Sequence, residues 1–131
     1  MKPATQEWIE KAEADYRTSL REMRVRRRPN HDAVCFHAQQ CIEKYLKALL
    51  TEHELLFPKI HDLVRLGKLC FQIISGLQAL EAELDLLSRY AVAFRYPGET
   101  AIQEEAKAAV KAMEKVRTLI KNSLQEPQEE R

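Results

Sequence analysis

Helix-breaking residues are scarce in this chain and stand at a few well-separated positions. Glycine and proline together make up 8 of its 131 residues, about half of their usual share. Pro29, Pro58 and Pro97 divide the chain into segments long enough for helical hairpins, and Gly76 divides the third segment again. A proline ring blocks the continuation of a helix, whereas an all-β fold needs many more turn residues than these. The distribution of glycine and proline therefore favours an all-α fold.

Between these breakers, apolar residues recur every three or four positions, which is the spacing of one face of a helix. Five helices are predicted on this basis, at about residues 5–24, 30–54, 61–74, 77–94 and 102–124. Ser75–Gln78 and Thr100–Gln103 have the form of capping boxes before the last two helices. The apolar stripes of those two helices have heptad spacing, which suits near-antiparallel packing.

We therefore expect an all-α fold, an antiparallel bundle of four to five helices. It forms a single domain over residues 1–124. Residues 125–131 are polar and contain Pro127, so they are expected to form a flexible tail.

Composition and charge exclude several classes of protein. Apolar residues make up 45% and charged residues 31% of the chain, as in soluble globular proteins. With 21 Lys and Arg against 20 Asp and Glu, the formal charge is +1, which argues against a dedicated nucleic-acid-binding protein. The longest apolar run covers residues 90–94, far short of the about 20 residues of a membrane span. The first residues also lack the apolar region of a secretory signal, so we expect a cytoplasmic protein that does not contact a membrane.

The cysteines and histidines do not form a recognisable metal site. Cys35, Cys41 and Cys70 are odd in number and lack CxxC spacing, so they are predicted to be buried, reduced thiols. The four histidines include no HExxH motif, and no metal ligand is predicted. Glycine-rich loops of the Walker and Rossmann types are also absent from the sequence.

The predicted helix at residues 30–54 carries a narrow polar stripe on an otherwise apolar surface. Twelve of the 18 residues from 33 to 50 are apolar, so this helix is central or also faces a partner chain. At about 100° per residue, the stripe occupies an arc of roughly 120°. One interpretation is a solvated face with an ion pair between Glu43 and Lys47. The other is a polar groove that offers ammonium and amide groups to a phosphate-bearing ligand. The stripe consists of His37, Gln40, Glu43, Lys44 and Lys47.

Three further clusters also have both a structural and a functional interpretation. His61 and Asp62 stand at the start of the predicted third helix, where they cap it or point into a cleft. Arg95 and Tyr96 stand where the predicted fourth helix ends, and they would suit contact with a nucleobase or phosphate. The basic run Arg24–Arg28 forms a solvated loop or contacts a phosphate backbone.

The segment Phe36–Leu49, with the sequence FHAQQCIEKYLKAL, resembles the signature of the HEPN domain family (higher eukaryotes and prokaryotes nucleotide-binding). Smaller matches before and after it follow the order of the family pattern, and the resemblance covers about residues 5–124. The other matching residues are Trp8, Ala12, Asp15, Pro58, His61, Asp62, Leu63, Leu66, Arg95, Tyr96 and Pro97.

This resemblance implies a small helical bundle that forms a homodimer. Many prokaryotic members act with a minimal nucleotidyltransferase in a two-component module, often a toxin–antitoxin pair, and nucleotide binding has been proposed for the group. No cofactor is required on this view, and the expected ligand is a nucleotide such as ATP or GTP, or the nucleotidyltransferase partner. The candidate binding residues are His37 from the polar stripe and, by resemblance, Gln40, Glu43, Lys44, Lys47, His61, Asp62, Arg95 and Tyr96.

One departure from the family argues against catalysis. Ribonuclease members carry an arginine followed, after four to six residues, by a histidine in the late helices. Here no histidine follows His61, so Arg89 and Arg95 lack the partner that would act as general acid or base. We therefore predict a non-catalytic member without catalytic residues.

Two alternatives stay open. One is a metal-independent ribonuclease in which Arg95 acts with His61 or His37 from elsewhere in a dimer, with RNA as its substrate. The other is an interaction bundle whose polar clusters are only caps and surface pairs.

Overall fold

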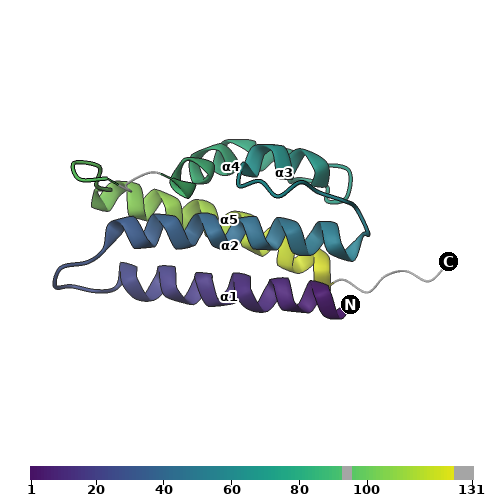
Figure 1. The fold of residues 1–131 in the computed structure, drawn as a ribbon, viewed down its shortest axis with the longest axis horizontal. Helices are drawn as coiled ribbons and strands as arrows, with labels where there is room; N and C mark the ends of the chain where they lie inside the picture. The colour runs from purple at the N-terminus through teal and green to yellow at the C-terminus, as the bar shows by residue number, and fades with distance from the viewer. Residues whose placement is uncertain (93–95, 126–131) are drawn as a thin grey trace.

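The computed structural model describes residues 1–92 and 96–125, which fold into five α-helices and two short 3-10 helices (Figure 1). These residues contain no strand, and the predicted all-α bundle is confirmed. Phe94, Arg95 and most of the predicted tail, residues 126–131, lie outside the described residues. The elements are α1 (Pro3–Met23), α2 (His31–Glu52), α3 (Leu63–Cys70), η1 (Gln78–Leu80), α4 (Glu81–Ser88), η2 (Arg89–Ala91) and α5 (Gln103–Gln125).

The central helix of the bundle is α2. Figure 1 shows α1 alongside it and α5 behind it, with the short helices α3 and α4 in a layer above. Thirteen of the 22 residues of α2 are buried, among them Ile42, Tyr45 and Leu46. The wide apolar arc of this helix is thus covered within one chain, so it provides no separate argument for a partner chain.

The apolar stripes predicted for α1 and α5 form two sides of the core. Ala12 of α1 is fully buried, and its other stripe residues pack against the core. The stripe of α5 is also buried except at its start, where Ile102 is 56% exposed. Ala101 is buried in its place, and its N–H donates a hydrogen bond to Asp32 Oδ1 of α2 at 2.6 Å. The remaining stripe residues are Ile9, Tyr16, Leu20 and Met23 on α1 and Ala106, Ala109, Met113, Val116 and Ile120 on α5.

The region after α3 differs from the continuous helix that was predicted there. Residues 78–91 form η1, α4 and η2 in succession, after Gly76 turns the chain at φ +95°, a conformation that favours glycine. A 3-10 turn also places residues i and i+3 on one side, so an apolar spacing of three cannot distinguish a broken helix from a continuous one. The predicted capping boxes were wrong as well. Leu77 precedes η1 without a side-chain cap, and Glu105 accepts the Ile102 N–H at 3.2 Å before α5.

The three cysteines are buried and form no disulfide, as predicted. Burial raises the pKa of both Cys35 and Cys70 to about 12, so these thiols stay protonated near neutral pH. Within the two described segments, no helix is long and apolar enough to cross a lipid bilayer.

Candidate functional site

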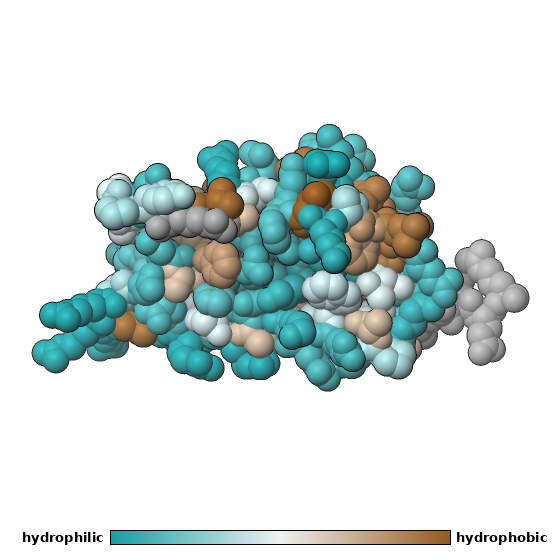
Figure 2. Space-filling model, in the orientation of Figure 1, coloured by the Kyte–Doolittle hydropathy of each residue, from teal (hydrophilic) through white to brown (hydrophobic). Residues whose placement is uncertain are grey.

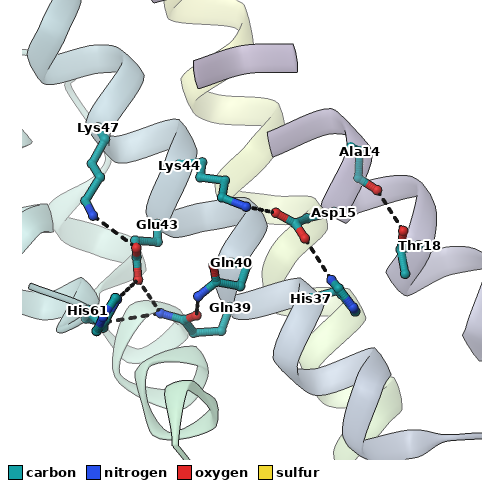
Figure 3. A network of polar contacts seen from close by, with 10 residues as sticks. All are labelled: Ala14, Asp15, Thr18, His37, Gln39, Gln40, Glu43, Lys44, Lys47 and His61. Atoms are coloured by element: carbon teal, nitrogen blue, oxygen red, sulfur yellow. Dashed lines mark hydrogen bonds and ion pairs between the residues drawn. The ribbon is translucent and has the colours of Figure 1, made fainter. Parts of the chain in front are cut away.

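The buried carboxylate of Glu43 on α2 lies at the centre of a polar network (Figure 3). Its Oε1 atom accepts a hydrogen bond from Gln39 Nε2 at 3.0 Å and contacts His61 Nδ1 at 2.9 Å. Its Oε2 atom pairs with Lys47 Nζ at 3.0 Å. Gln40 extends the network by donating from Nε2 to Gln39 Oε1 at 2.7 Å. The predicted ion pair between Glu43 and Lys47 is confirmed. The two residues are only 4% and 7% exposed, so the expectation that the pair lies on a solvated face was wrong.

Glu43 is ionised at neutral pH despite its burial. Desolvation by burial raises its pKa, but the contacts with Gln39, His61 and Lys47 outweigh that effect and hold the pKa below its usual value. An ionised carboxylate can only accept hydrogen bonds, so Nδ1 of His61 donates. This leaves Nε2 available on a side chain that is 66% exposed.

A second carboxylate, Asp15 on α1, holds the rest of the polar stripe (Figure 3). Its Oδ1 atom contacts His37 Nδ1 at 2.7 Å, and its Oδ2 atom pairs with Lys44 Nζ. Burial raises the pKa of Asp15, but the contacts with His37 and Lys44 lower it below the usual value. Two parts of the stripe thus have different partners. His37 and Lys44 contact a carboxylate of α1, whereas Glu43 contacts an imidazole from the segment before α3.

Some groups of this network can meet a ligand and others cannot. In the part of the chain that the structure describes, every buried side-chain nitrogen and oxygen has a hydrogen-bond partner. Lys47 is committed to Glu43 and also lies over the Trp8 ring, 5.7 Å from its centroid. The side chains that reach solvent are those of His61, Gln40, Lys44 and His37.

The remaining predicted site residues do not join this network within the described segments. Asp62 caps α3, because its Oδ1 accepts the N–H groups of Val64 at 3.0 Å and Arg65 at 3.3 Å. Tyr96 is 69% exposed, and Arg95 lies outside the described residues. Of the predicted His61–Asp62 pair, only the histidine reaches Glu43, and ligand binding by Asp62 and Tyr96 stays a prediction.

A third polar cluster, which the sequence did not reveal, joins α1, α2 and α5. Arg117 donates two hydrogen bonds to the Glu13 carboxylate, at 2.7 and 2.8 Å, and the Tyr45 hydroxyl donates a third at 2.7 Å. The hydrogen bonds from Arg117 lower the pKa of Glu13 to about 2. The guanidinium also lies 3.7 Å from the centroid of the Tyr16 ring. Because these groups satisfy one another, we assign this cluster a structural role.

Asp15 and Gln39 are network residues that the polar-stripe argument missed. Asp15 stands three residues after Ala12 and four before Ser19, which places it on the buried face of α1. A carboxylate on such a face requires a partner, and this position is the signal that could have revealed it. Gln39 is fully buried on the apolar side of α2, where the same argument applies.

The arrangement can bind through hydrogen bonds and charge, and it offers no ready metal site. Across residues 1–92 and 96–125, no three His, Cys, Asp or Glu side chains come together to hold a metal ion. The exposed edge of the network presents an imidazole, an amide and an ammonium group, which suits a ligand with hydrogen-bonding atoms and negative charge.

Comparison with known families identifies one match. The model of the HEPN domain family matches residues 5–123, which include the whole network of Asp15, Glu43 and His61. The resemblance noted in the sequence is thereby confirmed. No curated protein matches the chain at a significant level.

Two solved structures share the fold. TT1696 from Thermus thermophilus has a TM-score of 0.80 at 18% identity, with 93% of this chain and 99% of that chain covered. ST0689, an archaeal HEPN homologue, has a TM-score of 0.72 at 18% identity, with 95% of this chain and 100% of that chain covered. At such identities the likeness establishes a common helical bundle.

Proposed function

The chain belongs to the HEPN domain family, and from this premise we propose that it is a non-catalytic, nucleotide-binding member. It acts as a homodimer with a minimal nucleotidyltransferase partner, in a two-component module of the toxin–antitoxin type. The ligand is a purine nucleotide such as ATP or GTP.

The observation that carries this proposal is the 2.9 Å contact between the exposed His61 imidazole and the buried Glu43 carboxylate. A ring held in one orientation loses little further entropy when a ligand binds. Gln40 and Lys44 add an amide and an ammonium group from α2, the helix that carries Glu43. Hydrogen bonds suit a nucleobase or ribose, and positive charge suits phosphates.

The absence of a late histidine supports a non-catalytic role. No histidine follows His61 in the sequence, so an arginine of the later helices has no such neighbour to exchange protons with an RNA hydroxyl. Binding without turnover is then the simplest use of the network.

Exposed apolar side chains support an interface with another chain. Figure 2 shows hydrophobic patches on the side of the molecule where α3 and α4 lie. Large exposed apolar side chains are frequent at protein interfaces. The exposed apolar side chains of the described residues include Leu56, Val92, Tyr96 and Ile102, with exposed fractions of 96%, 59%, 69% and 56%. Leu56 follows the C-terminal end of α2, whereas Ile102 lies near its N-terminal end, where the Ala101 N–H meets Asp32.

Thermal-shift and calorimetric titrations with ATP and GTP test the ligand half of the proposal. At ten times its Kd, a nucleotide should add about 1.4 kcal/mol of stability and raise Tm by a few degrees. His61→Ala should abolish this rise, whereas His53→Ala, which removes an exposed histidine at the end of α2, should retain it. If neither ATP nor GTP at millimolar concentration changes the Tm of the wild type or gives a binding heat, the ligand half of the proposal is refuted.

Co-expression with the protein encoded beside this chain tests the partner half. A short nucleotidyltransferase that copurifies in a fixed ratio would support it. Separate elution of the two purified proteins at micromolar concentration would contradict it.

One observation also favours a second candidate, a metal-independent ribonuclease. An exposed imidazole oriented by a buried carboxylate is the arrangement of a general base. Incubation of RNA in EDTA, with wild type and His61→Ala in parallel, decides between the two. Cleavage by the wild type alone would replace the non-catalytic proposal, and intact RNA in both samples would remove the second candidate.

A further inference from the structure

The arginines of this chain are concentrated in one short segment. Six of its 11 arginines, and none of its ten lysines, fall within residues 17–28. The segment also contains one glutamate, so its formal charge is +5 and the rest of the chain carries −4. Although the net charge of the whole chain is only +1, residues 17–28 form a strongly basic segment. The six residues are Arg17, Arg21, Arg24, Arg26, Arg27 and Arg28.

Three of these arginines line a groove on the last turns of α1. The groove has a volume of about 280 Å³ and is formed by Arg17, Leu20, Arg21 and Arg24. At about 100° per residue, the three arginines lie roughly 180–240° around α1 from the buried Asp15. The groove thus faces away from α2 and from the Glu43 network. Its arginines are exposed and Leu20 is half-buried, which gives an apolar floor with cationic walls.

The remaining three arginines extend this surface into the loop between α1 and α2. Residues 26–28 are exposed, and Figure 2 shows hydrophilic side chains projecting from the end of the molecule where this loop lies in Figure 1. The carboxylate of Glu22, the segment's one acidic group, accepts the backbone N–H of Asn30 at 2.8 Å. Within the described part of the chain, none of the six guanidinium groups is held by an ion pair or hydrogen bond.

We propose that this arginine groove and the adjoining loop bind the phosphodiester backbone of a nucleic acid. The exclusive use of arginine favours phosphate, because a guanidinium donates two parallel hydrogen bonds to phosphate oxygens whereas an ammonium acts as a point charge. The row from Arg17 to Arg24 is about 10 Å long at 1.5 Å per residue. Separate guanidinium groups along it can therefore contact successive phosphates.

This surface is independent of the proposed nucleotide site. A backbone-binding surface contacts phosphate without reading bases, so it predicts affinity for polynucleotides of unrelated sequence. Loss of backbone binding and loss of mononucleotide binding are separate outcomes. The first depends on arginines of α1 and the following loop, whereas the second depends on residues of α2 and on His61.

Fluorescence anisotropy with labelled 20-nucleotide strands tests the proposal. The variant Arg17→Gln/Arg21→Gln/Arg24→Gln removes three exposed charges from α1. Its matched control, Lys107→Gln/Lys111→Gln/Lys115→Gln, removes three exposed charges from α5. At 50 mM salt the arginine variant should lose at least about tenfold in affinity, and its plot of log K against log salt should become shallower by about 2. The lysine variant should stay within about twofold of the wild type.

Parallel arms with RNA and DNA strands identify the source of the phosphates, and binding of either supports the proposal. The variant Arg26→Gln/Arg27→Gln leaves α1 intact and should also weaken binding, which guards against misfolding of the helix variant. Absence of binding by the wild type at 50 mM salt, or equal losses in the arginine and lysine variants, would overturn the proposal. Displacement of RNA by polyglutamate of equal total negative charge would overturn it too, because the surface would then bind any polyanion without a preference for phosphate.

Discussion

Glu43, Asp15 and Glu13 are carboxylates that lie between segments of the chain, and each is held by two or more donors. Helical periodicity correctly predicted that Glu43 and Lys47 share one face of α2. It did not predict their burial, because the covering groups come from α1 and from the segment before α3. The burial of a side chain depends on contacts between distant parts of the sequence, and the apolar periodicity of one helix does not predict those contacts.

The Glu43–Lys47 pair should behave as a buried ion pair. Glu43→Gln removes the charge that compensates Lys47, whose ammonium is then left without a counter-ion in a buried site. Such a loss costs about 3 kcal/mol, measured as the free energy of unfolding in urea.

Two further variants control this prediction. Glu10→Gln changes an exposed glutamate of α1 and should alter stability by less than about 0.5 kcal/mol. Glu43→Gln/Lys47→Met removes both charges and should recover part of the loss. If Glu43→Gln is as stable as Glu10→Gln, the buried pair does not stabilise the fold.

The Glu13–Arg117 pair predicts a defined loss of stability in acid. Hydrogen bonds from Arg117 lower the pKa of Glu13 from 4.5 to about 2, so the unfolded chain binds the proton more readily. The pair's contribution is complete above about pH 4.5 and is lost as the pH falls towards 2. Urea unfolding between pH 7 and pH 2 should show a shallower decline in Glu13→Gln than in the wild type. Parallel curves for the two proteins would show that Glu13 does not titrate in this way.

At the scale of elements, the bounds of the long helices could be predicted, whereas those of the short helices could not. The helices α1, α2 and α5 have 21, 22 and 23 residues, and their observed ends lie within about two residues of the predicted ends. Each displays its apolar stripe over about six turns. By contrast, α3 and α4 have eight residues each. Two turns of helix do not distinguish one element from its neighbours when apolar residues continue at the same spacing through 3-10 turns.

The short helix α3 depends on its cap. Asp62 accepts two backbone N–H groups at its start, so Asp62→Ala should cost about 1 kcal/mol in the free energy of unfolding. Asp85→Ala, which removes only an exposed pair with Arg89, should cost less than about 0.5 kcal/mol. Equal effects of the two substitutions would show that the cap contributes nothing beyond a surface charge.

At the scale of the whole molecule, one chain already covers the apolar face of α2, and the proposed homodimer needs another surface. Exposed apolar side chains such as Leu56 provide candidates for it. Sedimentation velocity at micromolar concentration should therefore give a species of twice the 15.3 kDa chain mass. Leu56→Glu, which changes a side chain that is 96% exposed, should shift it towards monomer. A wild-type species near 15 kDa at every concentration would exclude the dimer.

The most direct test of the proposed function is an NMR titration of the isotopically labelled protein with ATP and with GTP. The account predicts saturable shifts of the His61 ring and the Gln40 side-chain amide, with the His53 ring unchanged as an internal control. Resonances of His61 and Gln40 that stay fixed up to millimolar nucleotide would contradict it.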